Sequence, residues 1–347
     1  MAKKGINPSL KARLRARAAA PGSDDLIERL RRGDRAALSR AITLVESENP
    51  EHRAVATELI HACLPHAGNS VRVGITGSPG VGKSTFIEAL GEFLIDQRGH
   101  RVAVLAVDPS SPVTRGSILG DKTRMNNLSR RTEAYVRPSA AGTELGGVAR
   151  STRETIILCE AAGYDLIVVE TVGVGQSETT VRSLVDCFLL LLLPNAGDDL
   201  QGIKRGVVEM ADLLVVNKAE GEHQKAARAA RRAYRDSLHL FPAKAGGWSP
   251  TVHLMSALQR EGIDAVWAGV EKYLQHVRGN GFFEAQRQHQ STDWLQRALD
   301  AEFRRRFLAR PELVRALIES ERAVRTGTES PFAAAARLVE IFMNSPK

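Results

Sequence analysis

The segment that most constrains this chain is a glycine-rich stretch at residues 77–84, which reads Gly-Ser-Pro-Gly-Val-Gly-Lys-Ser. It follows an apolar run, Val71 to Thr76, and precedes a helix-like stretch, Thr85 to Arg98. A bare glycine-rich turn is the alternative, but a strand before and a helix after favour a phosphate-binding loop whose N–H groups surround a polyphosphate. Lys83 would contact the outer phosphates and Ser84 would bind Mg²⁺. The predicted phosphate-binding residues are Gly77, Ser78, Pro79, Gly80, Val81, Gly82, Lys83, Ser84 and Thr85.

Composition predicts a soluble globular protein of about two domains. Of the 347 residues, 43% are apolar, and the longest apolar run, Cys187 to Pro194, is too short to cross a bilayer. The three cysteines lie far apart without a C-x-x-C pair, which argues against a disulfide framework or a thiolate metal site. We therefore expect a cytoplasmic protein without a membrane segment.

The net charge of +8 owes much to residues 1–23, where the cations precede the first acid at Asp24. Such a segment could contact nucleic acid or an acidic partner, or could direct the chain to an organelle. A solvated, flexible tail is the favoured interpretation, because charged tails are commonly just that. A nucleic-acid partner is therefore not expected.

The rest of the chain divides into three parts by its hydrophobic pattern. A helical period predicts an N-terminal helical extension over residues 24–68. Over residues 69–279, short apolar runs alternate with helical stretches, which predicts an α/β domain of the P-loop NTPase class, with a doubly wound, mostly parallel sheet. The expected strands are Val71 to Thr76, Val102 to Val107, Leu166 to Glu170, Phe188 to Leu193, Leu213 to Val216 and Val252 to Met255. Ligands of such sheets bind at the C-terminal ends of the strands.

Residues 280–347 read as amphipathic helices without strand partners. Apolar positions such as Leu295, Leu299 and Phe303 lie among many Arg and Glu residues. An apolar stripe on such an arm commonly packs against a second subunit, although packing on its own domain is the alternative. We expect a C-terminal dimerisation arm and a homodimer.

Acidic residues follow two of the expected strands. Asp108 comes directly after Val107, where it could hold Mg²⁺ through water or orient an attacking water; a plain Asp-Pro turn is the alternative. Glu170 closes the next strand in the Walker B manner and is a second metal-side carboxylate. Gln176, in the glycine-containing loop behind it, could position water or be an ordinary polar loop residue.

The choice of base is also encoded. The strand ending at Val216 runs into Asn217-Lys218-Ala219-Glu220, close to the N-K-x-D signature whose acid accepts hydrogen bonds from guanine N1–H and its 2-amino group. Glu replaces Asp here and displaces the carboxylate by roughly 1.5 Å, which a small backbone shift could absorb. Ser256, Ala257 and Leu258 match the loop whose backbone N–H meets guanine O6.

Together these segments resemble the methylmalonyl-CoA mutase-associated GTPases of the MeaB type over about residues 24–345. The most specific matches are the segments 108–125, Gly146 to Arg150, 170–178 and Ala196 to Lys204. The resemblance implies a GTPase that binds GTP, GDP and Mg²⁺ and docks on an adenosylcobalamin-dependent acyl-CoA mutase. It would gate cofactor loading and protect that mutase, and it would form a homodimer through its C-terminal helices.

The resemblance also assigns residues. Lys83 and Ser84 would serve phosphate and Mg²⁺, while Asp108, Asp121 and Glu170 would organise metal and water. Lys204 would reach the nucleotide region when the mutase is bound. Two departures are Glu220 in place of Asp and Arg115 where Gly is common, and Arg115 puts a bulky cation beside the phosphates.

Two rival functions stay open from the sequence. One is an ATP-dependent phosphotransferase, because relatives carry an old label as an arginine and ornithine transport kinase. The other is a metal-insertion GTPase of the nickel type, which would need Cys and His clusters. His61 and Cys63 are close in sequence but lie in an apolar helical pattern that indicates packing.

Overall fold

The protein is described by a computed structural model that covers residues 23–47, 49–107, 125–137, 145–171, 177–194, 205–239, 241 and 244–344. The chain forms two compact units, one up to Arg287 and the other from Gln288 onward. The division falls inside one helix. It lies seven residues after position 280, the position at which the sequence pattern changes. Within the described ranges, no helix is long and apolar enough to cross a membrane.

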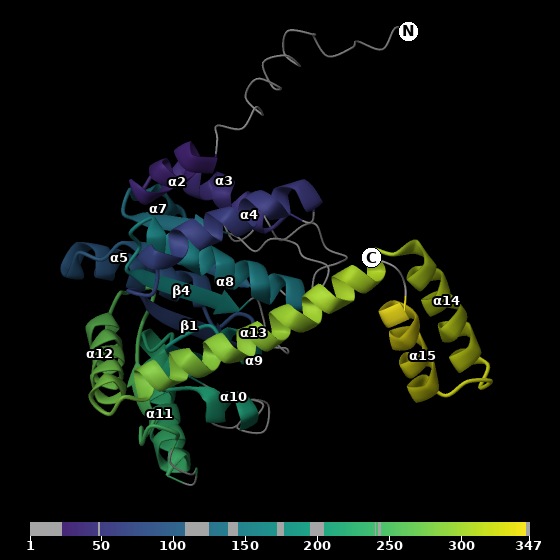
Figure 1. Cartoon of the computed structure of the whole chain (residues 1–347). Coiled ribbons are helices and arrows are strands. Elements are labelled where there is room, and N and C mark those ends of the chain that lie inside the picture. Colours follow the sequence, from purple (N-terminus) through teal and green to yellow (C-terminus); the bar gives the residue numbers. More distant parts are fainter. Residues whose placement is uncertain are drawn as a thin grey trace, which may run out of the picture. The chain divides into compact units, whose positions relative to one another are not determined.

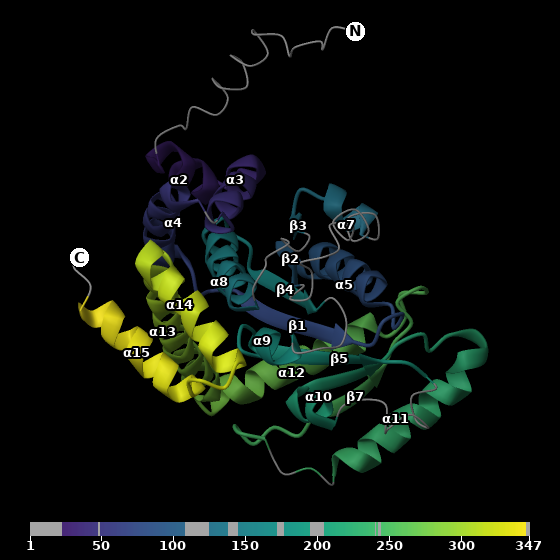
Figure 2. The same ribbon diagram turned by 90° about the vertical axis from the view of Figure 1, so that its right-hand side faces the viewer.

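The first unit is built on a parallel sheet of seven strands in the order β3-β2-β4-β1-β5-β6-β7 (Figures 1 and 2). The strands are β1 (Val71–Gly77), β2 (Val102–Val107), β3 (Ala134–Arg137), β4 (Leu166–Thr171), β5 (Cys187–Leu192), β6 (Leu213–Val216) and β7 (Thr251–Leu254). After β1 the chain builds the sheet first on one side and then on the other, so β1 lies at the topological switch point where such folds bind ligands.

Six of these strands confirm the expected runs to within a residue or two, and β3 was not predicted. It is a four-residue edge strand whose last two residues are only half-buried. Since an edge strand buries less than a central one, its sequence carries little of the apolar signal that marks the others.

Helices cover both faces of the sheet. On one face lie α5 (Lys83–Arg98) and α12 (Ile263–Gly279), with the short α7 (Asn126–Arg130) beside α5. On the other lie α8 (Leu145–Ala161), α9 (Ser177–Arg182), α10 (Arg205–Met210) and α11 (Gln224–Leu238), which follows the 3₁₀ turn η2 (Gly221–His223). Successive side chains of a strand point to opposite faces of the sheet. In β5, Leu189 and Leu191 face α12, while Leu190 and Leu192 face α10 and α11.

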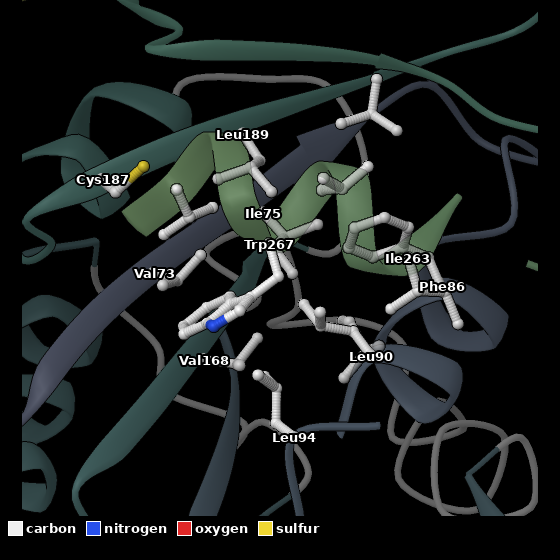
Figure 3. Packing of buried hydrophobic residues seen from close by; sticks show 14 of the residues in the cluster. Val73, Ile75, Phe86, Leu90, Leu94, Val168, Cys187, Leu189, Ile263 and Trp267 are labelled. Carbon is white, nitrogen blue, oxygen red and sulfur yellow. The ribbon is translucent and has the colours of Figure 1, made fainter. Parts of the chain in front are cut away.

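The core under α5 and α12 fixes the start of α5. Phe86, Leu90 and Leu94 of α5 interlock with Ile263 and Trp267 of α12 over the strands (Figure 3). All five side chains are at most 3% exposed. At about 25 cal/mol for each Å² of apolar surface buried, each such side chain contributes roughly 1.5–3 kcal/mol. This packing stabilises the position of α5 against the sheet.

Three helices and a 3₁₀ turn precede β1 and pack on α8 (Figure 2). They are α2 (Ser23–Arg31), α3 (Arg35–Val45), α4 (Pro50–Cys63) and η1 (Leu64–His66). Local chemistry starts two of them, because the Asp34 carboxylate accepts from Ala36 N at 2.8 Å and the Asn49 side chain caps α4 ahead of Pro50.

Helix α13 (Phe282–Leu308) begins in the first unit and continues into the second, which also contains α14 (Pro311–Arg325) and α15 (Pro331–Asn344). Proline opens both shorter helices. Between α14 and α15, Arg337 donates to Ser320 Oγ at 2.9 Å and pairs with Glu329. The second unit is therefore a helical hairpin joined to the end of α13.

Candidate functional site

The predicted phosphate-binding loop joins β1 to α5 at the switch point of the sheet. Gly80 and Gly82 have φ values of +78° and +91°, in the left-handed region that glycine adopts without strain. Gly82 caps α5 without a side chain, and Phe86 N donates to its carbonyl at 2.9 Å. The first N–H groups of α5 therefore point toward the loop with no capping side chain competing for them, which is the arrangement that binds a phosphate.

Close packing also demands glycine in this loop. A Cβ on Gly77 would lie 2.7 Å from the carbonyl oxygen of Leu191, and a Cβ on Gly82 would lie 2.9 Å from Asn217 Nδ2. A Cβ on Gly80 would meet nothing within 4 Å. Neighbouring residues thus leave no room for a side chain at Gly77 and Gly82, whereas the space around Gly80 is open.

Lys83 lies at the first position of α5, half-buried. Its ammonium donates to the carbonyls of Gly77 at 2.7 Å and Ser78 at 3.3 Å, so it spans the loop from within. A four-carbon stem lets this cation move to phosphate oxygens without backbone rearrangement.

Asn217 joins the phosphate-binding loop to the predicted base-recognition segments. Its side chain is buried, its Nδ2 donates to the carbonyl of Val81 at 2.8 Å, and its Oδ1 accepts from Ala257 N at 3.1 Å. The structure therefore brings together three segments, around residues 81, 217 and 257, that the sequence places far apart. Ser256 is buried in the same loop, whereas Leu258 is 77% exposed.

Two of the three residues after Asn217 also belong to the predicted base-recognition segment. Lys218 has φ of +57°, a left-handed conformation that is uncommon outside glycine and concentrates at functional sites. Glu220 is half-buried, and its Oε2 is buried without a hydrogen-bond partner among the residues that the structure describes. A buried carboxylate oxygen of this kind fits a ligand that presents N–H donors, as the guanine edge does.

The acidic side of the site begins at the ends of β2 and β4. Glu170 is buried, lies beside Ile75 of β1 and Ala106 of β2 in register, and precedes Thr171, which pairs with Val107. Asp108 follows Val107 directly, but its own position lies outside the described residues. The same holds for Asp121, Gln176, Lys204 and Arg115.

One contact in this region was not anticipated from the sequence. Thr171 Oγ1 donates to Thr76 Oγ1 at 2.8 Å, and both hydroxyls are buried. The bond ties the last residue of β4, just before the loop 172–176, to the strand that carries the phosphate-binding loop. A buried polar residue closing an apolar strand was the signal that could have found it.

The donor set fits magnesium in its chemistry. Ser84, at the second position of α5, offers a hydroxyl, and Glu170 offers a carboxylate at the end of β4. Hard oxygen ligands, with the substrate's phosphates, are what Mg²⁺ takes in such sites. Asp108 and Asp121 would add to this set and stay predictions.

Comparison with known proteins finds a family-model match to "Methylmalonyl Co-A mutase-associated GTPase MeaB" over residues 38–312. A "Probable GTPase" of Mycobacterium tuberculosis is 52% identical over 318 residues, covering 92% of this chain and 94% of that protein. GTPase ArgK of Escherichia coli is 48% identical, covering 88% and 92%.

A mitochondrial "Methylmalonic aciduria type A homolog" of Mus musculus is 44% identical and covers 92% of this chain and 79% of its own length. Among solved structures, that of a LAO/AO transport system kinase superposes with a TM-score of 0.73 at 40% identity, covering 93% of this chain and 98% of that one. The resemblance drawn from the sequence motifs is thereby confirmed.

Proposed function

Because the chain belongs to the methylmalonyl-CoA mutase-associated GTPase (MeaB) family and is a GTP hydrolase, we propose that it acts as a nucleotide-dependent chaperone of an adenosylcobalamin-dependent acyl-CoA mutase. Its nucleotide state would gate cofactor loading onto that mutase and protect the mutase from inactivation, in the cytoplasm. The name of the matching family supports the partner.

The observation that carries the nucleotide part is the position of Asn217. Its two hydrogen bonds link the phosphate-binding loop to the 256–258 loop, and Glu220, three residues further along the chain, has a buried Oε2 without a hydrogen-bond partner among the described residues. A guanine base would satisfy Glu220 through its N1–H and 2-amino groups, which adenine does not offer together. This arrangement supports GTP rather than ATP as the substrate.

Hydrolysis would rest on positioning and charge stabilisation. The N–H groups at the start of α5 and the Lys83 ammonium would stabilise the charge that develops on the transferring phosphoryl group. Water held near Asp108, Glu170 or Gln176 would attack the γ-phosphorus in line and release GDP and phosphate. Mg²⁺, held by Ser84 with Asp108, Asp121 and Glu170, would neutralise phosphate charge when bound.

The switch would act through the loops that follow β2, β4 and β5. β4 and β5 pair with β1, β2 pairs with β4, and the Thr171–Thr76 bond joins the last residue of β4, just before residues 172–176, to β1. Loops anchored on a rigid edge can respond to the γ-phosphate while the core stays in place. Lys204, in the loop after β5, would join the nucleotide region once the mutase is bound.

A homodimer is part of the proposal. Leu295, Leu299 and Phe303 follow each other at four-residue spacing on α13 and are 68%, 52% and 55% exposed. Four-residue spacing places all three on one face of a helix, and an exposed apolar stripe favours burial against a second copy.

One solved relative is described as a transport system kinase, so phosphotransfer from ATP is the second candidate. The GTPase and the phosphotransferase differ in the nucleotide that they bind. Titrating the full-length protein with fluorescent GDP and ADP should show clear guanine selectivity, and Lys83→Ala should abolish hydrolysis of GTP. Selective ADP binding would favour the kinase instead.

The partner is tested by measuring binding to purified methylmalonyl-CoA mutase with GDP or with a non-hydrolysable GTP analogue. We expect an affinity that depends on the nucleotide, and a transfer rate of adenosylcobalamin to the mutase that depends on GTP hydrolysis. Equal or undetectable binding in both states would contradict the chaperone function while leaving the GTPase intact.

A further inference from the structure

A cavity of 610 Å³ lies in the first unit, near the N-terminal ends of β6 and β7. The phosphate-binding loop, in contrast, follows the C-terminal end of β1. The lining residues of the cavity come from the end of α10, the end of α11 and the segment before β7, and Figure 2 shows α10, β7 and α11 near one another. The volume of the cavity falls within the range typical of sites for small molecules. It is lined by Val208, Glu209, Arg235, Leu238, His239, Phe241, Lys244, Trp248, Ser249 and Pro250.

Half of this lining is apolar and rigidly supported. Trp248 is buried, donates from its indole Nε1 to the carbonyl of Asp212 at 3.0 Å, and meets the Tyr273 ring edge-on at 5.3 Å between centroids. Val208 belongs to the buried cluster under α10 and α11, and Leu238 and Phe241 pack against it. The cavity therefore has a preformed apolar wall that could accept a ring or a short alkyl chain.

The lining also includes a half-buried ammonium group that shares its counterion. Lys244 Nζ donates to the Ala211 carbonyl at 2.5 Å and contacts Asp212 Oδ1 at 3.2 Å. The same carboxylate is already paired with Arg182 at 2.8 Å and accepts from Phe188 N at 2.9 Å. Among the described residues, one carboxylate thus serves two cations, so Lys244 shares its counterion with Arg182.

A shared counterion balances the charge of Lys244 only in part. The Lys244 side chain is 16% exposed, and burial lowers the pKa of its ammonium group even though Asp212 acts in the opposite direction. A buried cation without a full counterion is stabilised by a neighbouring anion. Among the residues that the structure describes, this ammonium group donates to Ala211 and Asp212, so a third hydrogen can serve an acceptor in the cavity.

We propose that this cavity is a binding site for a small carboxylate with an apolar or aromatic body. The carboxylate would accept from Lys244, near Arg235 and His239, and the body would lie along Trp248 and Phe241. A carboxylate carries a single negative charge, which suits one partly balanced ammonium group, whereas a phosphate ester carries about −1.5 to −2 at neutral pH and would meet Glu209 on the same rim.

The site is separate from the nucleotide site and does not depend on the proposed mutase partner. Strand β6 begins just after Asp212 and ends at Val216, next to Asn217, while α11 begins after the η2 turn that follows Glu220 and ends at Leu238 in the cavity lining. Both elements therefore span the distance between the two sites. Binding should not compete with GDP.

The test is calorimetric titration of the full-length, GDP-saturated protein with 2-naphthoate and with its neutral analogue 2-naphthamide. We expect the carboxylate to bind about tenfold more tightly than the amide, since one charged hydrogen bond separates them. Lys244→Met should remove this difference, whereas Lys272→Met, a matched change on the exposed side of α12, should leave it unchanged. Glu209→Gln, which removes a like charge, should strengthen naphthoate binding by about threefold.

Three results would overturn the proposal. The first is equal affinity for the acid and the amide, and the second is competition between naphthoate and GDP. The third is unchanged naphthoate binding in the Glu209→Gln protein, which decides the matter even if Lys244→Met does not fold.

Discussion

The side chain of Asn217 donates to the backbone carbonyl of Val81 at 2.8 Å, and a Cβ on the next residue, Gly82, would lie 2.9 Å from the same nitrogen. Base recognition and phosphate binding therefore share one contact, and a change at either residue should affect both. This contact is specific enough to test by a single methyl group.

Gly82→Ala should weaken GDP binding by more than tenfold. The added Cβ would strain a backbone at φ of +91° and push Asn217 away from Val81, at a cost of about 1–3 kcal/mol. Titration with a fluorescent GDP measures the loss. Gly99→Ala is the matched control, because Gly99 ends the same helix at φ of +69° with nothing within 4 Å of its Cβ. Equal GDP affinity in both variants would show that the loop tolerates the methyl group.

Glu220→Gln should lower GDP affinity by about tenfold to a hundredfold, because a neutral amide accepts less strongly and its NH₂ group opposes the guanine 2-amino group. The same variant should gain affinity for xanthosine diphosphate, whose base offers an oxygen at that position. Glu222→Gln changes an exposed neighbour and should alter neither affinity. If Glu220→Gln binds GDP like the parent protein, the longer acid does not contact the base.

Arg287→Met should destabilise the first unit by about 3–5 kcal/mol, because it leaves a buried carboxylate without its partner. Arg287 donates to both oxygens of Asp186, at 2.8 and 2.7 Å, and to the Ser70 carbonyl at 2.6 Å. Urea unfolding measures the free energy change. The exposed Arg325 of α14 provides the control, and Arg325→Met should change stability by less than about 0.5 kcal/mol. If Arg287→Met lowers the free energy of unfolding by less than 1 kcal/mol, the first turns of α13 are held by apolar packing instead.

The central strands and the phosphate-binding loop were predictable because their signals are local. An apolar run followed by a spaced set of glycines and Lys83 needs no knowledge of distant residues. The edge strand β3 was missed because it buries too little apolar surface to differ from a loop. Its identity depends on pairing with β2, which only the folded chain provides.

The contacts between distant segments could not be derived from spacing. The Thr171–Thr76 bond and the Asn217–Val81 bond each join residues about 100 positions or more apart. The cavity around Lys244 and Trp248 is of the same kind, because its residues come from α10, α11 and the segment between α11 and β7, which carry no shared motif. Sequence identified which residue types are present, and the topology of the sheet decided which of them meet.

The remaining prediction concerns pH. His253 of β7 is half-buried, its Nε2 lies 2.9 Å from Thr251 Oγ1, and a Cβ on Gly269 of α12 would lie 2.7 Å from that nitrogen. Burial lowers the pKa of His253 below its ordinary 6.5, and the charge of Arg231 adds to the effect. The unfolded chain therefore takes up this proton at a higher pH than the folded protein does.

A depressed histidine pKa stabilises the fold fully above pH 6.5, and the contribution is lost as the pH falls through the lower, folded-state value. The parent protein should consequently lose more stability between about pH 7 and pH 5 than His253→Gln does. Urea unfolding at both pH values measures the difference, and His61→Gln, on the exposed side of α4, should keep the parent's slope. An identical slope for His253→Gln and the parent would show that His253 takes up its proton without cost, and that the tight contact with Gly269 opens to let water reach the ring.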